Sequence, residues 1–241
     1  MMTPRLEPDP VVREEEVPLV GADILRLRSV ADDAGSEAGV EAALAWVTEG
    51  KALPATVLPL YGTHVVWSPA RAVCIAPADR LGQVCDAVVE FSRCESGIRD
   101  LEAGIVAGLS DLDGDATAVF DVDLDDARCR QLAGRYRAAV GIQAGLARLA
   151  PQVHTPRLHP PTLAGQIAER LRDRTRLAER LEFAVQQAEV LVRVYEQCGQ
   201  RASDAVISGR HLRLEWAIVV LLAAETLFLF VDLLASSSTP T

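Results

Sequence analysis

Residues 216–235 read WAIVVLLAAETLFLFVDLLA, a run of twenty residues in which nearly every side chain is apolar. At about 1.5 Å per residue, a helix over this run would measure roughly 30 Å, the thickness of the hydrocarbon core of a bilayer. The run therefore predicts one transmembrane helix over 214–235, with a short tail at 236–241. The alternative is a buried helix of a soluble bundle, because Glu225 and Asp232 interrupt the run.

Basic residues flank this run only on its N-terminal side. Arg201, Arg210 and Arg213 precede it, and no basic residue follows it. Cytoplasmic flanks of membrane helices carry the excess of Lys and Arg. The distribution predicts a single-pass, tail-anchored protein of the cytoplasmic membrane whose N-terminus is cytoplasmic. Trp216 begins the run, at the position where membrane helices place interfacial aromatic residues.

The two carboxylates are the most informative side chains of the run. Glu225 lies near its middle, where an ionised carboxylate costs on the order of 3 kcal/mol and is seldom left facing lipid. Asp232 follows seven residues later, so both carboxylates lie about 20° apart on one helix face. His211 and Glu215 fall on the same half of the helix. We expect this face to pack against copies of the same helix or, alternatively, against the stem of its own chain.

Composition limits the function of the remainder. The net charge is −10, and the acidic excess lies within residues 1–150, where Lys51 is the sole lysine. Since a basic stripe is absent, direct nucleic-acid binding is not expected. The five cysteines contain no C-x-x-C pair, so we expect reduced thiols and neither a disulfide framework nor a zinc site. No metal or other cofactor is predicted.

The hydrophobic pattern predicts an α+β domain over 17–150, preceded by a disordered acidic arm at 1–16. A small antiparallel sheet covered by helices is expected. The predicted strands are 17–20, 55–61, 64–67, 72–76 and 117–122; the predicted helices are 24–31, 40–48, 79–109 with a break near 94–97, and 123–149.

The second half of the chain is expected to be helical. Four prolines within 151–161 predict a linker. An amphipathic stem over 162–213 would then continue into the transmembrane helix. The pattern leaves open whether the stem is one helix or, with a break near Thr175, a hairpin.

Two elements of this half carry a resemblance to a known family. Arg180, Leu181, Glu182, Phe183 and Ala184 form the first element; Leu214, Glu215 and Trp216, an aliphatic run and Glu225 form the second. Over residues 165–235 this order resembles the family of the protein required for meiotic nuclear division and sporulation. The resemblance implies a single-pass membrane protein that assembles with itself. Mitochondrial members of that family support translation of organelle-encoded proteins as scaffolds or tethers, with no catalytic mechanism attached.

One acidic motif imitates the beginning of a calcium-binding loop. Asp111, Asp113 and Asp115 have the right spacing, but Ala116 and Val122 occupy the positions where such a loop requires Gly and Glu. An ordinary polar turn is therefore the expected structure. No phosphate-binding loop or serine-nucleophile motif occurs in the sequence.

These features together predict a tail-anchored, self-associating membrane scaffold or tether without catalysis. Its predicted partners are the lipid bilayer and further copies of the chain, bound through the stem and the membrane helix. The residues expected to form these contacts are His211, Arg213, Glu215, Trp216, Glu225 and Asp232, with Arg180, Leu181, Glu182 and Phe183 in the stem. Two alternatives remain open: a proton- or ligand-responsive membrane sensor that uses Glu225, and an enzyme with its site in the α+β domain.

Overall fold

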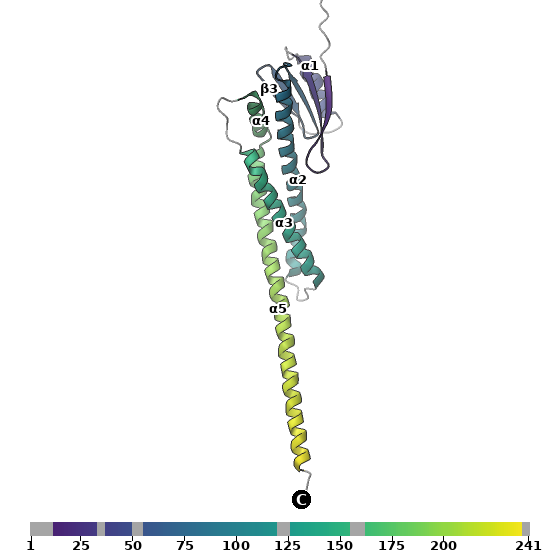
Figure 1. Cartoon of the computed structure of the whole chain (residues 1–241), viewed down its shortest axis with the longest axis vertical. Helices are drawn as coiled ribbons and strands as arrows, with labels where there is room; N and C mark the ends of the chain where they lie inside the picture. Colours follow the sequence, from purple (N-terminus) through teal and green to yellow (C-terminus); the bar gives the residue numbers. More distant parts are fainter. Residues whose placement is uncertain (1–11, 33–36, 50–54, 120–125, 155–161, 238–241) are drawn as a thin grey trace, which may run out of the picture. The chain divides into compact units, whose positions relative to one another are not determined.

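The computed structural model describes residues 12–32, 37–49, 55–119, 126–154 and 162–237 (Figure 1). Side chains at 113, 118, 119, 126, 202–213 and 230–237 lie outside this description. The chain divides into two compact units. The first unit comprises Met1–Ala107 and Ala139–Glu189, and the second comprises Gly108–Ala138 and Val190–Thr241.

The first unit contains a five-stranded mixed sheet with the order β1-β2-β5-β4-β3. Its strands are β1 (Val12–Pro18), β2 (Ile24–Ala31), β3 (Thr56–Leu60), β4 (Thr63–Trp67) and β5 (Arg71–Ala76). Neighbouring strands are antiparallel except β2 and β5, which are parallel. The prediction of an antiparallel sheet is therefore wrong. The connection from β2 to β5 passes through a helix and the β3–β4 hairpin, and it returns the chain in the original direction.

Strand β2 occupies a segment that was expected to be helical. Leu25 and Leu27 are buried, whereas Ile24 and Arg26 between them are exposed. Burial that repeats every two residues is the pattern of a strand. Pairing with β1 on one side and β5 on the other satisfies the backbone hydrogen bonds of this segment. The adjoining β1 begins at Val12, inside the predicted disordered arm.

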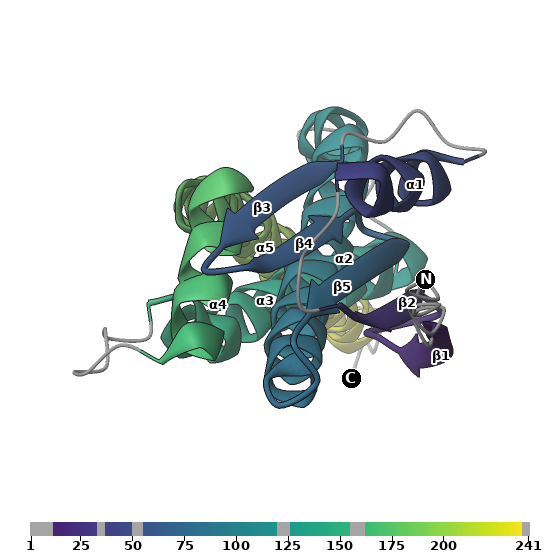
Figure 2. The ribbon, with the colours of Figure 1, turned by 90° about the horizontal axis from the view of Figure 1, so that it is seen from above.

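Helices cover both faces of the sheet. Helix α1 (Glu37–Thr48) packs with Val66 of β4 in one buried apolar cluster. The next residue, Trp67, points to the opposite face, because successive side chains of a strand alternate. There its ring meets Phe91 of α2 (Leu81–Val119), edge to face, with centroids 5.0 Å apart. Figure 2 shows α1 and α2 on either side of the sheet. The α+β class agrees with the prediction.

Helix α2 runs without interruption through the predicted break at 94–97. Gly97 lies against another helix of the unit: a Cβ built there would lie 3.1 Å from Leu149 Cδ1. The glycine therefore permits close packing and does not end the helix. The predicted strand at 117–122 is wrong for residues 117–119, because these belong to helix α2, which extends to Val119. Residues 120–122 lie outside the described residues.

The later helices are α3 (Asp126–Val153), α4 (Leu163–Arg174) and α5 (Leu177–Ser237). Pro151, assigned to the predicted linker, lies inside α3, and residues 155–161 lie outside the described residues. The stem bends at Thr175 and Arg176, where Arg176 has a positive φ of 51°. The stem is therefore two helices, joined where the sequence pattern left a break open.

The predicted transmembrane helix is not found. Across the parts of the chain that the structure describes, no helix is long and apolar enough to cross a membrane. The predictions of a transmembrane helix over 214–235 and of a single-pass, tail-anchored location with a cytoplasmic N-terminus are therefore wrong.

The β3–β4 hairpin turns at two residues with positive φ, Tyr61 at 48° and Gly62 at 76°. Two-residue turns of this kind favour Asn or Asp at the first position, because a bulky side chain is strained there. Replacing Tyr61 with Asn should raise the free energy of unfolding by about 0.5–1 kcal/mol. Urea denaturation would measure the change. Tyr61→Ala, which keeps the Cβ, is the control; equal stabilisation by Ala and Asn would contradict the backbone explanation.

Candidate functional site

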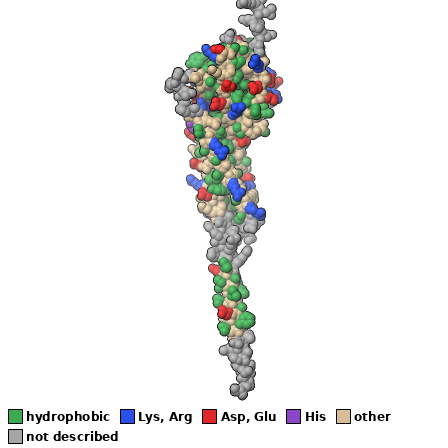
Figure 3. Space-filling model, viewed as in Figure 1, with side chains coloured by type: hydrophobic (Ala, Val, Ile, Leu, Met, Phe, Trp, Pro, Cys, Tyr) green, Lys and Arg blue, Asp and Glu red, His purple; other side chains and the backbone are tan. Residues whose placement is uncertain are grey.

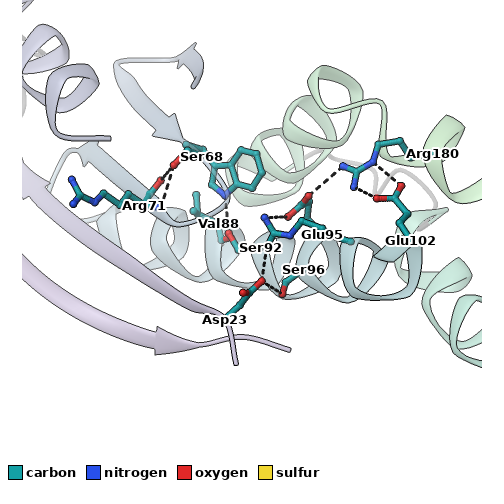
Figure 4. Close-up of polar contacts among 11 residues, drawn as sticks. Asp23, Ser68, Arg71, Val88, Ser92, Glu95, Ser96, Glu102 and Arg180 are labelled. Carbon is teal, nitrogen blue, oxygen red and sulfur yellow. Dashed lines mark hydrogen bonds and ion pairs between the residues drawn. The ribbon is translucent and has the colours of Figure 1, made fainter. Parts of the chain in front are cut away.

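Arg180, the first residue of the predicted stem element, lies in a half-buried ion-pair cluster of the first unit (Figure 4). Its guanidinium forms two hydrogen bonds to Glu102, Nε to Oε1 at 3.0 Å and Nη2 to Oε2 at 2.6 Å. A third bond joins Nη1 to Glu95 Oε1 at 3.2 Å. Hydrogen bonds to Glu102 raise the pKa of Arg180 above its ordinary value, and the charges of both carboxylates add to this effect. The group stays charged.

The cluster continues to the turn between β1 and β2. Glu95 lies 3.7 Å from Nη1 of Arg99, one helical turn further along α2. Asp23 in the turn accepts hydrogen bonds from Arg99 Nη2 at 2.7 Å and from Ser96 Oγ at 3.2 Å. Sequence reasoning missed this chain of ion pairs, because its members are far apart in the sequence. Its role is to hold α5 and the β1–β2 turn against α2.

The other residues of the predicted stem element take no part in the ion-pair cluster. Leu181 is buried in the helical core, whereas Glu182 and Phe183 are exposed. The four residues thus share a helix but do not form one site. Arg180 and Leu181 stabilise the fold, and only Phe183 presents an apolar surface to the outside.

The second unit has its own buried charge, Asp115, in the motif that imitates a calcium loop. Its side chain is 2% exposed and accepts hydrogen bonds from Arg135 and from the hydroxyl of Tyr195, the latter at 3.2 Å. Arg128 Nη2 lies 3.1 Å from its other oxygen. Asp111 pairs with Arg135 at 3.3 Å.

These aspartates lie on helix α2, so the expected polar turn is not present at Asp111 and Asp115. The arginines come from α3 and the tyrosine from α5. Burial raises the pKa of Tyr195, which keeps its hydroxyl protonated as a donor to the carboxylate. The cluster therefore joins three helices of the second unit. The seven-residue interval between Arg128 and Arg135, two helical turns, was the sequence signal that could have revealed it.

The most conspicuous surface of the chain is the apolar segment of α5 at residues 216–229. Its large exposed side chains are Trp216, Ile218, Val219, Val220, Leu221, Leu222, Leu227, Phe228 and Leu229. Green side chains cover the described part of this segment in Figure 3. Thr226 donates its hydroxyl to the carbonyl of Leu222 at 2.7 Å, so its polar group is satisfied within the helix. Glu225 is exposed and is the single charged residue of the segment.

Three of the residues predicted to form contacts lie in or beside this segment: Trp216 and Glu225 inside it and Glu215 just before it. All three are exposed. The other three, His211, Arg213 and Asp232, belong to the same helix, but their side chains lie outside the described residues. The structure thus gives no partner within the described chain for the large apolar side chains of residues 216–229.

Three comparisons with known proteins found no relative of this chain. A scan against protein-family models, a search of curated proteins and a search of solved structures each found no match. These comparisons do not test the family resemblance of residues 165–235, which stays a prediction.

Proposed function

We propose that this protein is a self-associating scaffold whose copies assemble through residues 216–229 of α5. The observation that carries the proposal is the exposure of nine large apolar side chains along these residues, at 216, 218–222 and 227–229. Contiguous apolar patches of this kind are rare on monomers and mark interaction surfaces. The resemblance of residues 165–235 to a family of scaffolds implies the same behaviour.

The distribution of apolar residues around the helix indicates how many partners it needs. Ile218, Val219, Val220, Leu221 and Leu222 follow one another directly and are all exposed. Five consecutive residues at about 100° each reach every side of a helix. A partner helix on one side would cover a single stripe. More than one neighbouring helix is therefore required, which corresponds to an assembly of three or more chains.

The rest of the segment suits packing between identical helices. Its single charge, Glu225, is accompanied by Thr226, whose hydroxyl is already bonded within the helix. Apart from Glu225 and the indole N–H of Trp216 at its end, the segment brings no unsatisfied side-chain polar group into an interface. No reaction is proposed for this segment, since its one hydroxyl, that of Thr226, donates to the carbonyl of Leu222 and not to a base.

Replacing Leu222 with Glu tests the proposal. Leu222 is 58% exposed, so the isolated chain should tolerate the change. In an assembly the new carboxylate would be buried without a partner, which should weaken association by about 3 kcal/mol, on the order of a hundredfold in the dissociation constant. Size-exclusion chromatography with light scattering would show a mass that falls towards that of the single chain.

Val106→Glu is the matched control, because Val106 is an apolar residue of α2 with similar exposure, 66%. The control variant should keep the mass of the wild type. If Leu222→Glu left the mass unchanged, or if both variants lowered it equally, the α5 segment would not be the site of self-association.

A further inference from the structure

A cavity of about 560 Å³ lies in the first unit beside the sheet-covering half of α2. Three other elements border it: the end of α3 with Gln152, the beginning of α4 with Thr162, and Leu177 at the start of α5. Its volume is within the roughly 300–1,000 Å³ typical of small-molecule sites. It has no part in the proposed self-association.

The interior wall of this cavity is apolar. Ala87, Phe91 and Cys94 on one face of α2, together with Leu177, line it and are almost fully buried. Burial raises the pKa of the Cys94 thiol, so this side chain is neutral at physiological pH. An apolar body inserted here would leave water for an apolar environment, which is favourable at about 25 cal/mol per Å².

The border of the cavity carries more negative than positive side chains. Asp86 and Glu90 lie four residues apart on α2, hence on the same side of the helix, and both are exposed. Within the described ranges, neither carboxylate has an ion-pair partner. Arg172 is the one basic residue of the lining, and its Nη1 already donates to the carbonyl of Gln152 at 2.8 Å.

A ligand that suits this cavity would have an apolar part for the buried wall and a positive charge for the two carboxylates at the border. We propose that the cavity binds a small organic cation, an ammonium group attached to an apolar body. The ammonium lies between Asp86 and Glu90, and the apolar body lies against Phe91 and Leu177. On the same cavity, Arg172 joins α3 to α4 through its hydrogen bond to Gln152.

Calorimetric titration of the full chain with 2-phenylethylammonium tests this proposal. The wild type should bind one equivalent, with a dissociation constant on the order of 1 mM or lower. The double variant Asp86→Asn, Glu90→Gln should bind at least about tenfold more weakly, a change that about 1.4 kcal/mol produces. Neutral 2-phenylethanol, which has the same apolar body, should also bind at least about tenfold more weakly than the ammonium.

Glu37 and Glu41 provide the matched control, because they are exposed carboxylates four residues apart on another helix, α1. The double variant Glu37→Gln, Glu41→Gln changes the net charge equally and should keep wild-type affinity. Equal weakening by both double variants would show that only the overall negative charge matters, and would overturn the site. Absence of saturable binding, or equal affinity for the alcohol, would overturn it as well.

Discussion

Replacing Arg180 with Met should lower the free energy of unfolding by about 3 kcal/mol. The substitution removes three hydrogen bonds and leaves Glu95, whose side chain is 4% exposed, as a buried carboxylate. Among the described residues, its remaining ion-pair partner is Arg99, at 3.7 Å. Removing one partner of a buried ion pair is costly because the other charge stays behind in a poor solvent. Urea denaturation followed by circular dichroism would measure the loss.

The Arg176→Met variant is the control for this experiment. Arg176 lies one turn earlier, is 77% exposed and pairs with Glu179 only at the limit of 4.0 Å. Its replacement should change stability by no more than about 0.5 kcal/mol. In the Arg180→Met background, Glu95→Gln should recover part of the loss, because it removes the stranded charge. If Arg180→Met and Arg176→Met had equal effects, the cluster would contribute nothing to the fold.

Replacing Asp115 with Asn should destabilise the second unit by about 2–3 kcal/mol. The carboxylate is almost fully buried, forms ion pairs with Arg128 and Arg135, and accepts hydrogen bonds from Arg135 and Tyr195. An amide has the same shape but half the acceptor oxygens and no charge. Hydrogen bonds to charged groups contribute about 1.5–3 kcal/mol. Hydrogen exchange of the amides in 108–119 and 190–201 should become faster, since these segments depend on the cluster.

Asp111→Asn is the comparison that isolates burial. Asp111 contacts the same Arg135, at 3.3 Å, but its side chain is 53% exposed. Water screens such a pair, so the substitution should cost less than about 1 kcal/mol. Equal acceleration of exchange in both variants would contradict the assignment of Asp115 as the centre of the cluster.

The local part of the fold could be predicted from the sequence. Gly62 and the Ser68–Pro69 dipeptide separate three short β-prone runs, and the structure has β3, β4 and β5 in these places. The run at 24–31 could not be assigned in this way, because its apolar residues fit both helical and strand spacing. The run forms a strand because it pairs with β1 and β5. Local sequence does not show the pairing with β5, because the two strands are far apart in the sequence.

The buried charge clusters could not be predicted, for a related reason. Arg180 and Glu102 are 78 positions apart, and Tyr195 and Asp115 are 80 apart. Nothing in local spacing shows that such residues meet. The arginines and acids near Arg180 look like a solvated helix surface, which is true of Glu182 but not of Arg180.

Sedimentation equilibrium of the purified 241-residue chain is the most direct test of the proposed self-association. The calculated mass of one chain is 25.9 kDa. If residues 216–229 are buried between copies, the measured mass should be at least three times this value at concentrations of about 10–100 μM, and it should fall on dilution. A mass of 25.9 kDa throughout this range would contradict the account.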